Sequence, residues 1–421
     1  MFFSSEVEEV LSWEGVSLNI KKGSKAVKQV ARVLQEATIH AQESIQSRNE
    51  GKVVDTPADT LSGLSESLSG QGSLLLSQAI EEWVEDKSRT SWASKTREAH
   101  EGWARQLIAA LGDKPVVQYT KADAREFRQL LLQLPPAWER KVELKGLDIA
   151  AASERADMLG MQPMSLKTAR KVIGFVSSLW SWMVDNYDLD KNIFQGIKIK
   201  VKSKPQDARM PFTIEELKSI FAAPLYTGAL AKNRPHDKGD YLDRASARYW
   251  SPLIGLYSGM RLNEILQLHV TDIREEGGIH YFSVNSEDGK SLKTHSSHRS
   301  IPIHERLLDA GLLEFVQGCT TKRLFPELKA NKHGSYSDPV THFFSELLRR
   351  QGIKHDKIAF HSFRHTFEDG CRNNGVTKEV MDALQGHAEQ GMSGRYGAGF
   401  ELKVLNEGVQ KVDYGLGMLG V

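Results

Sequence analysis

The stretch HSFRHT, residues 361–366, decides how the fold and chemistry of this chain are interpreted. Residues three apart lie on one face of a helix, so His361 and Arg364 place an imidazole beside a guanidinium. His361 and His365 also have the spacing of a helical zinc pair. However, Ser362 stands where that motif carries its catalytic Glu, and the cation between the two histidines disfavours a divalent metal. We therefore predict an anion site here and no metal site.

Further residues of compatible chemistry flank this stretch. Taken singly, each has an ordinary structural explanation, such as an ion pair on a helix surface or a packed tyrosine. Together they supply guanidinium, ammonium, imidazole and phenol groups without a carboxylate pair. In chain order they are Arg261 in GMRLNE (259–264), Lys293 in KSLKTHSSHR (290–299), His387 in QGH (385–387) and Tyr396 in RYG (395–397).

This set of side chains suits a phosphate that is attacked by a protein nucleophile. Arginine forks bind non-bridging phosphate oxygens and stabilise the charge of a pentacoordinate transition state. A phenol is a weak nucleophile at neutral pH and needs a base or a field of cations to activate it. A lysine can protonate a leaving alkoxide. The set therefore indicates phosphoryl transfer without a bound metal.

The motifs GMRLNE, a hairpin lysine, HSFRHT, QGH and RYG, in this order, resemble the catalytic signature of the tyrosine recombinases, the phage integrase family. The resemblance covers about residues 74–400. It implies that Tyr396 attacks the phosphate and forms a 3′-phosphotyrosyl bond, and that Arg261 and Arg364 clamp the phosphate. It also implies that Lys293 protonates the leaving 5′ oxygen, that His361 accepts the tyrosine proton and that His387 hydrogen-bonds the phosphate. Glu264 would support Arg261.

Two of these roles have rivals. Lys290 lies in the same connection as Lys293, but Lys293-Thr followed by Arg299-Ser-Ile-Pro-Ile resembles the family hairpin better. Tyr414 is a second candidate nucleophile, although it lies 27 residues beyond His387, farther than the usual spacing.

The fold class that follows is mainly α with a small β-sheet or hairpin in the catalytic domain. An N-terminal helical (SAM-like) core-binding domain would precede an α+β catalytic domain. Apolar stripes at helical spacing support the first domain, and their tryptophans are expected to be core residues. The expected order is an accessory arm or docking helix (1–50), a Ser/Gly-rich linker (51–73), the core-binding domain (74–196), a basic linker (197–210), the catalytic domain (211–400) and a tail (401–421).

Lysines alternate through the basic linker, which indicates an extended segment with its charges on one side. It is either a solvated connection or a strap that follows DNA phosphates. The tail could dock on a neighbouring subunit through its apolar residues. The four lysines are Lys198, Lys200, Lys202 and Lys204, and the apolar residues of the tail are Leu402, Val404 and Leu405.

The amino-acid composition restricts the kinds of site and the cellular compartment that this chain can have. The 421 residues carry 55 Lys+Arg and 54 Asp+Glu, a net charge of +1, so any site for a polyanion must be a local cluster. Cys319 and Cys371 cannot form a disulfide framework, which favours a cytoplasmic protein, here expected with the nucleoid. The sequence lacks a membrane-length apolar run and a phosphate-binding GxxxxGK[ST] loop. GLGMLG (415–420) has no strand before it and no helix after it, as a dinucleotide site would require.

We therefore expect a site-specific DNA recombinase of a mobile element, which integrates or excises DNA without cofactor or ATP. Its partners would be duplex DNA with crossover sites, three further copies in a synaptic tetramer and accessory DNA-bending or directionality factors. Two alternatives remain open. One is a type IB topoisomerase-like enzyme that relaxes DNA, and the other is a non-catalytic DNA-binding regulator.

Overall fold

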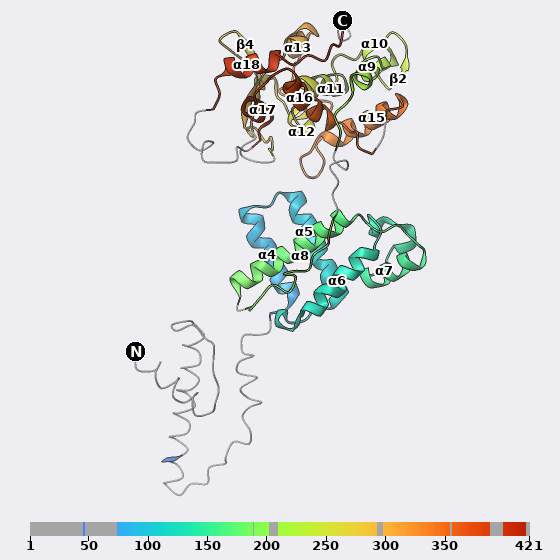
Figure 1. Cartoon of the computed structure of the whole chain (residues 1–421), viewed down its shortest axis with the longest axis vertical. Helices are drawn as coiled ribbons and strands as arrows, with labels where there is room; N and C mark the ends of the chain where they lie inside the picture. The colour runs from blue at the N-terminus through green and yellow to red at the C-terminus, as the bar shows by residue number, and fades with distance from the viewer. Residues whose placement is uncertain are drawn as a thin grey trace.

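The computed structural model describes residues 45–46, 74–187, 189–201, 209–292, 298–353, 356–387 and 399–417 (Figure 1). The expected arm and the Ser/Gly-rich linker lie outside the described residues, apart from the helical pair 45–46. Lys202, Lys204, Lys293 and Tyr396 also lie outside them. Each of the two domains in Figure 1 has its own hydrophobic core, the first formed by residues 76–199 and the second by residues 212–416.

The first domain is entirely helical in its described part. Thr120 begins one helix by accepting a hydrogen bond from the Ala122 amide, and that helix ends before Pro135 and Pro136. Ser165 begins the longest helix, whose stripe from Val172 to Met183 is buried. The helices are α4 (Leu76–Thr90), α5 (Ser94–Leu111), α6 (Lys121–Gln133), α7 (Ile149–Met158) and α8 (Leu166–Asn186), with single turns η1 (Val116–Gln118), η2 (Trp138–Arg140) and η3 (Val142–Leu144).

Most of the described tryptophans are core residues, as their helical register predicts. Trp83 and Trp180 are almost completely buried, and Trp138 and Trp182 are nearly so. Trp92 and Trp103 are only partly buried.

The described part of the basic linker lies along the helical domain. Ile199 packs into the core of this domain, whereas Lys198 and Lys200 are exposed. The alternation of the sequence therefore directs these two lysines to solvent.

The second domain combines short helices with two antiparallel sheets. Its helices are α9 (Ile214–Phe221), α10 (Pro224–Thr227), α11 (Ala247–Ser258), α12 (Leu262–Leu266), η5 (Val270–Asp272), α13 (Glu305–Asp309), α14 (Leu312–Gln317), α15 (Ser337–Arg350), α16 (Ser362–Asn373), α17 (Lys378–Gln385) and α18 (Leu402–Gln410). β1 (Ala229–Ala231) pairs with β2 (Arg234–Lys238), and β3 (Ile273–Glu276), β4 (Ile279–Val284) and β5 (Arg299–Pro302) form the second sheet in that order. The predicted fold class, mainly α with a small sheet, is confirmed.

Helix α11 forms the centre of this domain and packs on α16. Every residue of α11 except Arg248 is buried. Gly259 ends α11 with φ +64°, and a Cβ there would collide with Phe367 at 2.5 Å. The turn that precedes Arg261 is thus set by α16.

The described part of the tail packs on its own domain, with Leu405, Val409 and Tyr414 in the core. Leu402 is partly buried, and Val404 is exposed. Residues 402–416 therefore complete the second domain, and docking of the tail on a neighbouring subunit stays a prediction.

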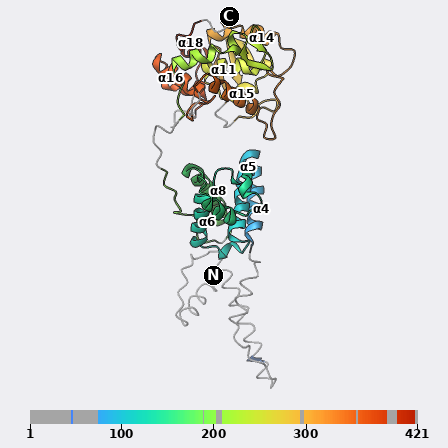
Figure 2. The same cartoon turned by 90° about the vertical axis from the view of Figure 1, so that its right-hand side faces the viewer.

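The two domains also touch through side chains. Lys332 Nζ donates to Glu98 Oε2 at 2.9 Å, and His333 Nε2 lies 3.6 Å from the same carboxylate oxygen. Figure 2 shows α5, which carries Glu98, beside the second domain. In the described part of the chain, no helix is long and apolar enough to cross a lipid bilayer.

Candidate active site

Arg261 is held at the start of α12. Its backbone N–H donates to Glu264 Oε2 at 3.0 Å, and its Nη1 donates to Glu264 Oε1 at 2.7 Å. The Arg261 side chain is 26% exposed, whereas Glu264 is buried. One carboxylate therefore caps the helix and orients a guanidinium that still reaches solvent.

Glu264 also binds a second arginine. Arg299, the first residue of β5, donates from Nη2 to Glu264 Oε2 at 2.9 Å and from Nε to the Leu384 carbonyl at 2.7 Å. Burial raises the pKa of Glu264, but Arg299 and Arg261 more than offset this and lower it overall. Arg299 thus joins three segments that are far apart in sequence: the start of α12, strand β5 and the end of α17.

Arg364 occupies the buried side of the same cluster. Its Nη1 donates to the Gly259 carbonyl at 2.7 Å and its Nη2 to the Gln385 carbonyl at 2.6 Å. Burial, Arg261 and Arg299 together lower the pKa of Arg364 to about 9. It remains protonated at neutral pH. Arg261 and Arg299 pair with Glu264, and Arg364 lies within electrostatic range of both arginines and of Glu264. This excess of positive charge favours a bound anion.

His387 contacts the same arginine. It follows Gly386, which ends α17 in the left-handed region with φ +65°. His387 Nε2 lies 3.0 Å from Arg364 Nη2, and its Nδ1 lies 3.1 Å from Asp382 Oδ1. The structure therefore brings Arg261, Arg364 and His387 together and adds Arg299 and Asp382, which the sequence interpretation did not include.

His361 is the N-cap of α16 and keeps contact with solvent, although neighbouring residues shield part of its ring from water. Its ring meets the His365 ring edge-on, with centroids 5.0 Å apart. Desolvation by surrounding residues is the largest cause that lowers the pKa of His361 to about 4, and His365, Arg364, Arg261 and Arg209 act in the same direction. A neutral imidazole at pH ~7 can accept a proton, which is the property a general base needs.

The lowered pKa of His361 predicts an acid-sensitive contribution to stability. The unfolded chain binds this proton near pH 6.5 and the folded chain only near 4, so stability is lost as pH falls between these values. His361→Gln should flatten the pH dependence of Tm in this interval, measured by thermal unfolding. An unchanged slope would show that His361 is not held neutral in this interval. His342→Gln, at an exposed position of α15, is the matched control.

Lys290, the rival of Lys293, forms a buried ion pair with Asp272. Its Nζ donates to both Asp272 oxygens at 2.6 Å, and both side chains are almost fully buried. The Gln267 side chain exchanges two hydrogen bonds with the Ser291 backbone, each 3.0 Å long. These contacts anchor the chain just before Lys293 and leave Lys290 without a proton-transfer role in this arrangement.

The two lysines should therefore respond differently to substitution. Lys290→Met leaves the Asp272 carboxylate buried without its cation and should cost about 3–5 kcal/mol of stability. Lys293→Met should slow DNA cleavage by about 10²–10⁴-fold. A substrate with sulfur as the 5′ leaving atom should restore the Lys293→Met rate, because a thiolate departs without protonation. If the sulfur substrate restored cleavage by Lys290→Met and not by Lys293→Met, Lys290 would be the general acid instead of Lys293.

Tyr414, the rival of Tyr396, is buried inside the second domain. Its hydroxyl donates to the Leu256 carbonyl at 3.0 Å, and burial raises its pKa well above the usual range. A phenol held in this way cannot reach a phosphate of duplex DNA without unpacking the core. Tyr396 therefore keeps its predicted role as a proposal.

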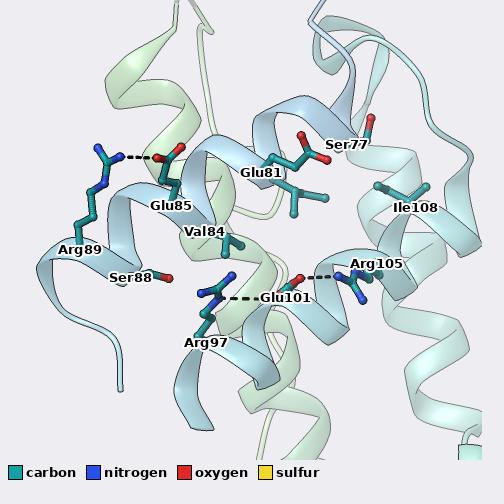
Figure 3. A pocket seen from close by; sticks show the side chains of 11 residues that line it. Ser77, Glu81, Val84, Glu85, Ser88, Arg89, Arg97, Glu101, Arg105 and Ile108 are labelled. Atoms are coloured by element: carbon teal, nitrogen blue, oxygen red, sulfur yellow. Dashed lines mark hydrogen bonds and ion pairs between the residues drawn. The ribbon is translucent and has the colours of Figure 1, made fainter. Parts of the chain in front are cut away.

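A separate hollow lies between α4 and α5 (Figure 3), with a volume of about 580 Å³. It is rich in arginine, but each arginine is paired. Arg89 binds Glu85, whereas Arg97 and Arg105 share Glu101. Because this hollow lacks the excess of positive charge found around Arg364, we do not assign it a phosphate.

No group of three or more His, Cys, Asp or Glu side chains that could hold a metal occurs among the residues that the structure describes. His361 and His365 contact each other without a third such ligand in that part of the chain.

Comparisons with known proteins show which family this chain resembles. Residues 240–401 match the model of the phage integrase family. Tyrosine recombinase XerD of Proteus mirabilis is 26% identical over 151 residues, which are 35% of this chain and 47% of XerD. The alignment thus spans about half the length of this curated relative. The predicted resemblance to the tyrosine recombinases of the phage integrase family is confirmed.

Solved structures share the fold. The Tn1549 transposon integrase in complex with a circular intermediate DNA is 17% identical with a TM-score of 0.51, and the match covers 81% of this chain and 100% of that one. A lambda integrase tetramer bound to a Holliday junction is 14% identical with a TM-score of 0.50, covering 84% and 88%. At these identities the likeness establishes the two-domain fold.

Proposed function

We propose that this protein is a site-specific DNA recombinase that breaks and rejoins DNA through a 3′-phosphotyrosine, and so integrates or excises a mobile element. The observation that carries the proposal is the cluster of three arginines. Arg261 and Arg299 pair with Glu264, and Arg364 lies nearby in contact with His387. His361 is the N-cap of the helix that carries Arg364. This cluster has the charge and the hydrogen-bond donors that a phosphodiester in its transition state requires.

In the proposed reaction, Arg261 and Arg364 bind the non-bridging oxygens. Tyr396 attacks phosphorus while its proton passes to neutral His361, and Lys293 protonates the departing 5′ oxygen. Attack by a 5′ hydroxyl then reverses these transfers and releases the tyrosine. Because the phosphotyrosyl bond conserves the phosphodiester linkage, the reaction as proposed requires neither ATP nor a metal ion.

The proposed partners are duplex DNA with specific crossover sites and further copies of the chain. The similar folds of an integrase on circular intermediate DNA and of an integrase tetramer on a Holliday junction support both. The two domains, proposed to divide at the 197–210 linker, would bind the duplex between them. Exposed Lys198 and Lys200, together with Lys202 and Lys204, would contact its phosphates. Accessory DNA-bending or directionality factors, action at the nucleoid and an accessory role for residues 1–72 belong to the same proposal.

Plasmid assays separate this function from its alternatives. DNA sites are first selected from a random pool with the Tyr396→Phe protein, and two copies are placed in a supercoiled plasmid. We expect recombinant products from the wild type. Relaxation without recombinants would favour a topoisomerase-like enzyme, and DNA binding without any strand cleavage would favour a regulator.

The contact between the two domains should stabilise the complex of the protein with DNA. Lys332 and His333 meet Glu98 on α5, so Glu98→Lys sets like charges against each other. The dissociation rate of a short duplex should rise about 2- to 5-fold at low salt, as expected for an exposed ion pair, and the effect should fade at high salt. Adding Lys332→Glu should restore slow dissociation. No difference between the single and double variants would show that the contact is absent on DNA.

A further inference from the structure

The hydrogen bonds of His387 determine which ring nitrogen carries its proton. A guanidinium can only donate, so Nε2 of His387 must accept the hydrogen bond from Arg364 Nη2 at 3.0 Å. Nδ1 then carries the proton and donates to Asp382 Oδ1 at 3.1 Å. Burial raises the pKa of Asp382, but its bonds to Lys378 and His387 more than offset this and lower it overall. In this hydrogen-bond arrangement, Nδ1 of His387 is therefore the donor and Nε2 the acceptor.

In this arrangement, Nε2 of His387 cannot donate to a phosphate. Nδ1 faces Asp382, so a phosphate oxygen bound by Arg364 would meet Nε2 instead. There, the lone pair of the ring nitrogen would face the lone pairs of the oxygen and repel them. The contact becomes favourable only when Nε2 also carries a proton. A carboxylate on the far side of an imidazole stabilises the cation that then forms.

We propose that Asp382 is a positioning residue that prepares His387 to take up one proton when a DNA phosphate enters the site. The proposal rests on the proposed function, because it requires a phosphate at Arg364. When the phosphate enters, Arg364 Nη2 stops donating to Nε2 of His387 and donates to a phosphate oxygen instead. One proton from the buffer binds Nε2, which then donates to the phosphate, and the bond from Nδ1 to Asp382 is kept.

Asp382 is the group that favours a second proton on the His387 ring, because the other charged groups that the structure describes around the ring are cations. Arg364 approaches from α16 and Lys378 lies beyond Asp382 on α17. From β5, the side chain of Arg299 packs against Gly386, where an added Cβ would lie 3.1 Å from Arg299 Cδ. All three are cations, which oppose a second proton on the ring. Asp382 is the acidic group that contacts the ring among the residues that the structure describes.

Binding calorimetry measures the proton directly. The Tyr396→Phe protein, which cannot cleave, is titrated with a short duplex selected by its own binding, in buffers of different ionisation enthalpy. We expect net proton uptake near neutral pH that falls by up to about one proton per site when Asp382→Asn is added. Asparagine keeps an oxygen acceptor for Nδ1 and removes the charge. Glu379→Gln, an exposed acid on the same helix, is the matched control and should leave the uptake unchanged.

Proton uptake that is absent, or equal with and without Asp382→Asn, would overturn the proposal. A second readout uses proteins that retain Tyr396. The alkaline limb of the single-turnover cleavage rate should move to lower pH in Asp382→Asn, whereas a merely structural defect would lower the rate equally at every pH. If the wild type forms no covalent adduct, the proposed function fails, but the calorimetry still decides whether Asp382 controls the proton.

Discussion

Replacing Tyr396 with phenylalanine should abolish the covalent protein–DNA adduct. The substitution removes the nucleophilic oxygen and nothing else, so strand cleavage should fall by about four orders of magnitude or more while DNA affinity stays nearly unchanged. The measurement is single-turnover cleavage of a suicide substrate, whose nicked strand releases a short fragment and traps the adduct. Binding of the same DNA by the variant shows that the site is intact.

Tyr414→Phe is the matched control because it removes the hydroxyl of the rival tyrosine. The lost hydrogen bond to the Leu256 carbonyl should cost about 1 kcal/mol of stability and leave cleavage in place. An adduct that persists in Tyr396→Phe and disappears in Tyr414→Phe would reverse the assignment, and would require the core around Tyr414 to open on DNA.

Arg261→Lys should separate catalysis from binding. Lysine keeps the positive charge but cannot bind Glu264 and two phosphate oxygens with a planar fork. We expect cleavage to slow by about 10²–10³-fold, the usual effect of losing a transition-state donor, with duplex affinity changed by less than about 10-fold. Because the Arg261 side chain is partly exposed and Arg299 still pairs with Glu264, Tm should change little.

The comparison variant for this experiment is Arg274→Lys, on exposed strand β3, which makes the same exchange away from the cluster. Cleavage by this control should match the wild type. If Arg261→Lys cleaved at the wild-type rate, its guanidinium would have no part in the transition state, and Arg299 would become the candidate for that role.

Local signals in the sequence predicted much of the fold. Thr213 and Glu216, three residues apart, form a capping box at the start of α9, and α8 begins after Ser165. Strand β2 was not predicted, because RPHDK contains a proline and mostly charged residues instead of an alternating apolar pattern. The apolar face of α18 was recognised, but periodicity cannot show whether such a face covers its own domain or another subunit.

The site shows the same division between local and long-range information. Motif order predicted which arginines and histidines to examine, and Arg261, Arg364 and His387 do lie together. Arg299 is different, because its role depends on contacts with Glu264 and Leu384, 35 and 85 residues away in sequence. Asp382 lies five residues before His387, a spacing that could have suggested the contact. No pattern within β5 could have revealed the role of Arg299.

The most direct test of the central claim is to identify the amino acid that becomes bonded to DNA. The adduct trapped on a suicide substrate is digested with protease and nuclease, and the modified peptide is sequenced by mass spectrometry. We predict a nucleotide attached through its 3′ phosphate to Tyr396, with a free 5′ hydroxyl on the released fragment. Attachment to Tyr414 or any other residue, or a bond through a 5′ phosphate, would contradict the mechanism.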